Sequence, residues 1–158
     1  MRMKGKKVYF NQRDTFSMDY TISRFMVPAL KAYRDVIKER HDNNKVVGVP
    51  GEVMIQLFPA AGYEYSEEQL SQGMEEWLRR VGEMIFAFDP KSDPDLKDYN
   101  FSFQTKVVER YENGSSRISI EHDNEEEYQR FRNDEKLYHE RKKAGLQYFS
   151  DHYDSLWW

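Results

Sequence analysis

The sequence contains no cysteine and no long apolar run. Without cysteine there can be no disulfide, thiol nucleophile or thiolate metal site, and this composition is typical of a reducing compartment. The longest apolar stretch, Phe25 to Leu30, is far shorter than the ~20 residues that a membrane span needs, and no leader-like segment opens the chain. We therefore expect a soluble, cytoplasmic protein with no membrane partner.

Catalytic motifs are also missing. Gly48 and Gly51 enclose Val-Pro and do not form a phosphate-binding loop of the Walker or Rossmann type. No two of the four histidines lie three or four residues apart, which excludes a helical His-x-x-x-His zinc site. Glu64 and Glu67 form a Glu-x-x-Glu pair, but no second pair at a useful distance completes a magnesium site. We expect no enzymatic activity, no metal and no cofactor.

The charge balance bears on partners. Lys and Arg number 24 against 28 Asp and Glu, so the net charge is -4, and the whole-molecule field repels a nucleic-acid backbone. A DNA or RNA duplex is therefore not expected as a partner. The length of 158 residues predicts a single domain, residues 1–158. Because 24 aromatic residues exceed what so small a domain can cover, we expect self-association through apolar helical surfaces, as a homodimer or tetramer.

Hydrophobic periodicity predicts three long amphipathic helices. The first covers residues 18–41, and its apolar stripe is Ile22, Phe25, Met26, Ala29, Tyr33, Val36 and Ile37. The second begins at a capping box formed by Ser66 and Gln69 and ends before Pro90. The third covers residues 124–157, at the C-terminus. Residues 42–63 are rich in turn formers and predict a long ordered loop without a regular element.

A β-hairpin is predicted between the second and third helices, over residues 99–121. Phe101, Phe103, Thr105 and Val107 alternate with polar residues, and Asn113-Gly114 supplies the turn. The predicted fold class is therefore mainly α with a small β-hairpin (α+β).

Charged residues interrupt the apolar faces of the helices. Lys31 and Arg34 flank the first stripe, and Glu140 and Arg141 interrupt the third. One interpretation of these charged residues is structural: their aliphatic stems cover apolar surface while the charge reaches solvent, or they form buried ion pairs. The other is functional, because aromatic planes beside fixed cations suit a stacked base and its phosphate.

Several phrases together resemble a widespread family of small tailed-phage proteins. These phrases are Asp19-Tyr20-Thr21-Ile22, Pro28-Ala29-Leu30-Lys31, Met84-Ile85-Phe86-Ala87-Phe88, Glu140-Arg141, Gly145-Leu146 and Leu156-Trp157. The family pattern reads Asp-Tyr-Ser-Leu, Leu-Pro-x-Leu-Lys, Met-Ile-x-Ala-Phe and Leu-Trp-Asp, and the resemblance covers roughly half of the chain. The chain departs from it at Ala144, where the family has Asn, and at Trp158, where the family has an acid.

This family resembles one that includes anti-CBASS sponges, phage proteins that sequester cyclic dinucleotide signals of bacterial defence without cleaving them. The resemblance implies immune evasion in the cytoplasm of the infected bacterial host, with ligands such as 3'3'-cGAMP bound between subunits of a homo-oligomer. The positions that it offers for base stacking and phosphate contacts are Tyr20, Lys31, His41, Arg141, Tyr153 and Trp157.

Two other functions stay open. The exposed aromatic C-terminus could dock on a host protein and inhibit it, and a nucleotide-processing enzyme with an unrecognised metal site is the third hypothesis. Arg141 is predicted to bind phosphate rather than to pair with Glu135 or Glu140. Trp157 is expected either to close a ligand pocket or to anchor the last helix.

Overall fold

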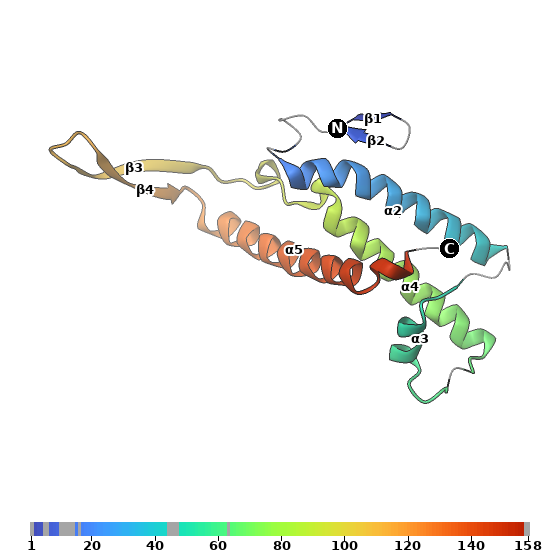
Figure 1. Ribbon diagram of the computed structural model, residues 1–158. Helices are drawn as coiled ribbons and strands as arrows, with labels where there is room; N and C mark the ends of the chain where they lie inside the picture. Colours follow the sequence, from blue (N-terminus) through green and yellow to red (C-terminus); the bar gives the residue numbers. More distant parts are fainter. Residues whose placement is uncertain are drawn as a thin grey trace. The chain divides into compact units, whose positions relative to one another are not determined.

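The computed structural model describes residues 2–4, 7–9, 15, 17–43, 48–62 and 64–156 (Figure 1). Its elements in chain order are β1 (Arg2–Lys4), β2 (Lys7–Tyr9), α2 (Met18–Asp42), α3 (Gly51–Leu57), α4 (Glu67–Phe88), η1 (Pro90–Ser92), η2 (Leu96–Asp98), β3 (Phe103–Arg110), β4 (Ser116–His122), α5 (Glu125–Asp151) and η3 (Tyr153–Ser155). The chain is mainly helical and carries an antiparallel hairpin, which confirms the predicted α+β class.

The chain divides into two compact units. The helical unit comprises Met1–Ser92 and Glu140–Trp158, and the hairpin unit comprises Asp93–His139. The prediction of a single domain over residues 1–158 stays a prediction. Charge is divided unequally, because the helical unit holds 17 Lys and Arg against 16 Asp and Glu, whereas the hairpin unit holds 7 against 12. The acidic character of the protein therefore belongs to the hairpin unit.

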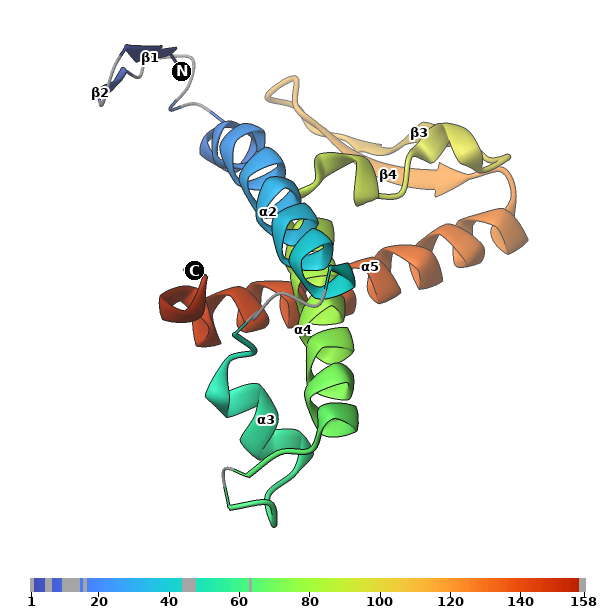
Figure 2. The ribbon, with the colours of Figure 1, turned by 90° about the vertical axis from the view of Figure 1, so that its right-hand side faces the viewer.

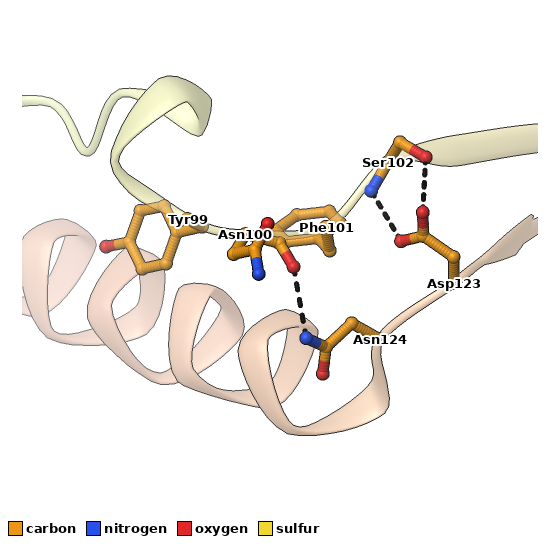
Figure 3. Close-up of a pocket in the computed structure, with 6 residues that line it drawn as sticks. All are labelled: Tyr99, Asn100, Phe101, Ser102, Asp123 and Asn124. Carbon is orange, nitrogen blue, oxygen red and sulfur yellow. Dashed lines mark hydrogen bonds between the residues drawn. The ribbon is translucent and has the colours of Figure 1, made fainter.

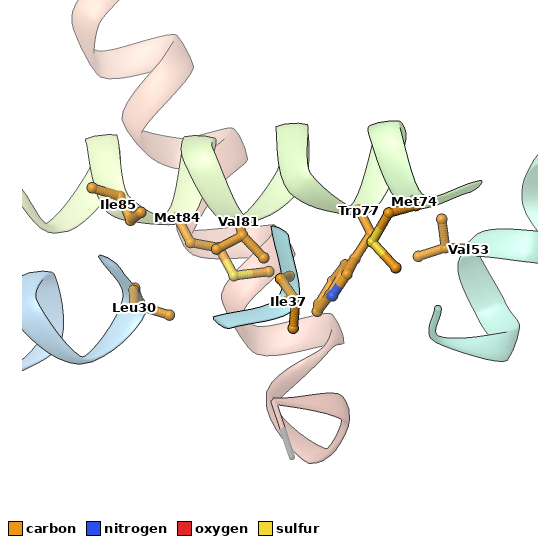
Figure 4. Packing of buried hydrophobic residues seen from close by; sticks show 8 residues of the cluster. All are labelled: Leu30, Ile37, Val53, Met74, Trp77, Val81, Met84 and Ile85. Atoms are coloured by element: carbon orange, nitrogen blue, oxygen red, sulfur yellow. The ribbon is translucent and has the colours of Figure 1, made fainter. Parts of the chain in front are cut away.

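The core of the helical unit lies where α2 and α3 pack on α4. Its buried residues are Leu30, Ile37, Val53, Met74, Trp77, Val81, Met84 and Ile85 (Figure 4). Trp77, Val81 and Met84 are fully buried. Burial of each such side chain contributes roughly 1.5–3 kcal/mol, so this row on α4 is the principal source of stability in the unit.

Helix α2 has nearly the predicted bounds, but its buried face differs from the predicted stripe. Ile22 and Phe25 are 43% and 48% exposed, whereas Thr21, Leu30 and Ile37 are buried. The prediction was therefore wrong over the first turns. Periodicity identifies a helix, but the neighbouring helix α4 determines which residues are covered.

Helix α3 corrects the prediction that residues 42–63 hold no regular element. Pro50 occupies the N-cap position, and Val53 and Met54 are buried. A helix of seven residues is too short to show a clear apolar period among so many turn formers. Its two buried side chains show that tertiary packing stabilises it.

Helix α4 begins as predicted. The backbone N–H of Gln69 donates to Oγ of Ser66 over 3.2 Å, and the backbone N–H of Ser66 donates to Oε1 of Gln69 over 2.9 Å. This reciprocal capping box satisfies two N–H groups that the first turn would otherwise leave unpaired. The helix ends at Phe88, two residues before Pro90, because proline cannot continue it.

The hairpin of β3 and β4 matches the predicted region, with β4 ending at His122, one residue beyond it. Its turn has three residues, Glu112 to Gly114, enclosed by a backbone bond from Tyr111 to Ser115, and Gly114 adopts a φ of 83°. Such a loop uses glycine because the left-handed conformation carries little steric cost there. A bulge lies between Val107 and Glu109 in β3.

Helix α5 ends at Asp151, earlier than the predicted residue 157. The chain then tightens into η3, where the N–H of Ser155 donates to the carbonyl of His152. Trp157, a predicted site residue, lies outside the described residues.

None of the helices in the described ranges is sufficiently long and apolar to span a membrane.

Candidate functional site

The predicted site residues on α2 are spread along the whole helix. Tyr20 lies in the first turn and His41 in the last, so they are separated by about 31 Å at 1.5 Å per residue. Lys31 lies roughly midway. Tyr20 and His41 of the same chain therefore cannot contact one small ligand together.

Lys31 and Arg141 both contact the C-terminal end of α4. Nζ of Lys31 lies 3.6 Å from a carboxylate oxygen of Asp89. Nε and Nη2 of Arg141 donate to the two carboxylate oxygens of Glu83, over 2.7 and 3.0 Å. The carboxylate that pairs with Arg141 is therefore that of Glu83, not that of Glu135 or Glu140. The partner, Glu83, is 58 residues away in sequence, and no local spacing could have identified it.

Arg141 is held from a second side by an aromatic ring. Its guanidinium carbon lies 3.9 Å from the ring centroid of Phe86, a cation–π geometry. The bidentate hydrogen bond to Glu83 raises the pKa of Arg141 above its usual value, so it stays charged. The side chain of Arg141 is 53% exposed, whereas that of Glu83 is 18% exposed. This arrangement presents an oriented cation to solvent.

Tyr153 ends a short row of aromatic rings. Phe88 of α4 packs edge-on against Phe149 with the centroids 5.0 Å apart, and Phe149 packs against Tyr153 at 5.7 Å. Tyr153 is 56% exposed. Two of the six predicted residues, Lys31 and Arg141, therefore contact the end of α4, and Tyr153 is joined to it only through Phe149 and Phe88. We call this set the α4 terminal cluster: Lys31, Glu83, Phe86, Phe88, Asp89, Arg141, Phe149 and Tyr153.

Helices α5 and α4 cross each other (Figure 2), and Gly145 of α5 lies against Glu83 and Ala87 of α4. A Cβ atom at this position would lie 2.2 Å from the backbone oxygen of Glu83 and 2.7 Å from Cβ of Ala87. Only glycine lets the two helices approach so closely. Arg141 precedes Gly145 by about one turn of α5, and Tyr153 follows it, beyond the end of α5 at Asp151.

A buried polar network lies beside the core. The side chain of Arg80 donates to Oε1 of Glu76 over 2.8 Å and contacts Nε2 of His152 over 3.0 Å. Nε1 of Trp77 donates to the hydroxyl of Tyr33 over 3.3 Å. Trp77 itself is fully buried. These bonds satisfy the N–H groups of Arg80 and Trp77 that would be costly to bury alone, so the network has a structural role, whereas the buried Nδ1 of His152 makes no hydrogen bond to a described residue.

The hairpin unit contains a pocket of about 370 Å³ (Figure 3). It is lined by Tyr99, Asn100, Phe101, Ser102, Asp123 and Asn124. The carboxylate of Asp123 accepts from the backbone N–H of Ser102 over 2.7 Å and from its hydroxyl over 2.6 Å. The Ser102 side-chain bond is the largest cause of the lowered pKa of Asp123. An ionised carboxylate in an acidic unit disfavours a phosphate here.

No group of three or more His, Asp or Glu side chains is placed to hold a metal ion in the part of the chain that the structure describes.

Comparison with known proteins gives no relative. No protein family, no curated protein and no solved structure matches the chain.

Proposed function

We propose that this protein binds and sequesters a small nucleotide with two phosphates, of the cyclic dinucleotide class, without cleaving it. The observation that supports this most directly is Arg141, which Glu83 and Phe86 hold in one orientation while half of its side chain stays exposed. A guanidinium has five N–H donors, and two of them bind Glu83. The remaining donors suit a phosphate, for which a fixed fork of N–H groups is the usual partner.

Lys31 gives this proposal a second cation in the same unit. It is 47% exposed and is attracted to Asp89 over 3.6 Å, a weak surface pair that a phosphate can replace at little cost. The helical unit has nearly balanced charge, so an anion is repelled less there than by the hairpin unit. The exposed ring of Tyr153 offers a stacking surface for a base.

Tyr20 and His41 enter the proposal through a second copy of the chain. Because they lie about 31 Å apart on α2, each would contact a ligand that another copy also holds. Such shared sites are what the sponge hypothesis expects, and the sequestered signal would belong to a bacterial defence system.

Ligand retention tests the proposal. The purified protein is incubated with a panel of cyclic dinucleotides, 3'3'-cGAMP included, then washed and heated, and the released compound is identified by mass. Intact ligand is the expected result. Release of a cleaved compound would instead indicate an enzyme, and no retention would contradict nucleotide binding.

Arg141→Ala separates the phosphate role from a structural one. We expect Kd to rise by roughly 10- to 150-fold, the equivalent of about 1.5–3 kcal/mol, through loss of a charge-assisted bond. Lys143→Ala is the matched control, because it removes the same charge from an exposed position two residues along α5. Equal affinity of the Arg141→Ala protein and the control would show that Arg141 only pairs with Glu83.

The alternative function is a protein-interaction module that inhibits a host protein through its aromatic C-terminus. Exposed Tyr153 favours it, whereas Leu156 packs against the core cluster and favours an anchoring role for the segment. Truncation after Tyr153 distinguishes them. A truncated protein that stays folded and retains nucleotide would support a docking role, and one that unfolds more easily would support the anchor.

A further inference from the structure

Among the described residues, the hairpin packs on others only at its base, where Phe103 and His122 contact the ring of Tyr128. It is a sheet of two strands, and nearly all of its side chains are exposed. Phe103, Val107, Ile118 and Ile120 are all about half exposed or more. A two-stranded hairpin is at best marginally stable in water, whereas three or more strands with an apolar face can be stable. A further strand would therefore stabilise this sheet.

We infer that the edge of β4 pairs with the β4 edge of a second copy of this chain, antiparallel and centred on Ser119. A two-fold axis perpendicular to the sheet then relates the two strands. This interface is independent of nucleotide binding, since it lies wholly in the hairpin unit.

The residue pattern of β4 is self-complementary in this register. Ser119 lies opposite its own copy, Ile118 lies opposite Ile120 of the second chain, and Arg117 lies opposite Glu121 of the second chain. Two Ile–Ile pairs and two Arg–Glu pairs form around one axis. Apolar and opposite-charge pairs across strands stabilise a sheet, and like charges destabilise it.

The hydrogen-bond pattern of the hairpin agrees with this register. The N–H of Asp123 donates to the carbonyl of Ser102 over 3.3 Å. Because an antiparallel ladder alternates, Glu121 and Ser119 also direct their backbone groups toward β3. Ile118 and Ile120 thus direct their backbone N–H and C=O groups to the open edge. The proposed register places Ile118 of one chain opposite Ile120 of the other.

The edge of β3 does not offer the same opportunity. The bulge between Val107 and Glu109 leaves Val108 without a partner in β4, and bulges interrupt the regular row of groups that a new strand requires.

The two strands and their turn carry balanced charge. The residues from Phe103 to His122 include three Lys and Arg (Lys106, Arg110, Arg117) and three Glu (Glu109, Glu112, Glu121). The paired strands therefore add no net repulsion of their own, although the hairpin unit as a whole holds 7 Lys and Arg against 12 Asp and Glu. The resulting four-stranded sheet joins the two apolar faces into one.

A single cysteine at the axis tests the register directly. The chain has no cysteine, so Ser119→Cys introduces its only thiol. In a non-hydrogen-bonded antiparallel pair the two Cα atoms lie about 4.5 Å apart, within the range for a disulfide. We expect mild oxidation to give a covalent dimer of the full-length protein.

Lys106→Cys is the control for random collision. Lys106 is the cross-strand partner of Ser119, so it lies on the same face of the sheet but one strand further from the axis. The two Lys106 positions would be separated by roughly 14 Å, three strand spacings, which is too far for a disulfide. Equal crosslinking of the two variants would overturn the inference.

Charge reversal supplies a second test that does not use cysteine. Arg117→Glu places like charges opposite each other twice, and we expect the dissociation constant of the dimer to rise about tenfold in light scattering. Adding Glu121→Arg restores both pairs and should restore the dimer. Arg110→Glu, on β3, should leave association unchanged. The inference fails if the double variant remains weakened, or if the unmodified chain scatters as a 19.1 kDa monomer.

Discussion

The guanidinium of Arg80 donates from Nη1 to Nε2 of His152 over 3.0 Å, inside the core of the helical unit. Since arginine has no acceptor, Nε2 must carry the lone pair and the imidazole must be neutral, with its proton on Nδ1. Burial, and next the charge of Arg80, lower the pKa of His152 below 6.5. Glu52 opposes this shift from 3.8 Å, but its side chain is 64% exposed. The folded protein therefore resists protonation of this ring.

We predict that stability falls with acidification because of His152. The unfolded chain takes up a proton near pH 6.5, whereas the folded ring does so only at lower pH. The free energy of unfolding should be highest above that pH and decrease as the pH falls below it. Chemical denaturation across this range measures the slope. His152→Gln, which keeps an acceptor for Arg80, should reduce the slope, and His139→Gln at an exposed position should not. Equal slopes would contradict the assignment.

A second pH effect is expected from Glu76 at lower pH. Hydrogen bonds, first from Arg79 and then from Arg80, lower its pKa from 4.5 to about 2. The contribution of the ionised Glu76 carboxylate to the free energy of unfolding is therefore complete above pH 4.5 and is lost as the pH falls through 2. After allowance for solvent screening we expect this contribution to stability to be roughly 1–2 kcal/mol at neutral pH. Glu76→Gln should show this loss in urea unfolding, with exposed Glu75→Gln as the control. An equally large loss of stability in the Glu75→Gln protein would refute the role assigned to Glu76.

The helix crossing at Gly145 predicts opposite effects of the same substitution at two glycines. Gly145→Ala should destabilise the protein by about 1–3 kcal/mol, because the new Cβ meets the backbone of α4. Gly82→Ala, inside α4, has open space around the new atom and should stabilise by about 0.5–1 kcal/mol. Thermal unfolding of both variants measures the contrast. Similar melting temperatures for the two would show that α5 does not pack as described.

Much of the fold could be predicted from the sequence because its signals are local. The capping box at Ser66 marks the start of α4 and Pro90 marks its end, and Asn113-Gly114 marks the turn of the hairpin. Helix α3 could not be predicted, since its stability depends on contacts of Val53 and Met54 with distant residues. The exposed positions of Ile22 and Phe25 were missed for the same reason.

The candidate site was only partly accessible to prediction. Lys31, Arg141 and Tyr153 were identified because they interrupt apolar faces or through a resemblance. Lys31 and Arg141 do contact the end of α4, whereas Tyr153 is joined to it only through Phe149 and Phe88. Glu83 and Asp89, their carboxylate partners, carry no signal in the sequence, because an ion pair between helices has no fixed spacing. The distance between Tyr20 and His41 followed from helix length alone.

The bulge in β3 also limits how far the proposed strand addition could extend. A two-stranded sheet has two open edges, and an assembly that adds a strand at both can grow without limit into a fibre. Val108, left out of the ladder, disrupts one of them. Growth that uses a single edge is finished after one addition, since both remaining edges of the product carry the bulge. A substitution or deletion that removed this one irregular residue would convert a closed association into an open-ended one.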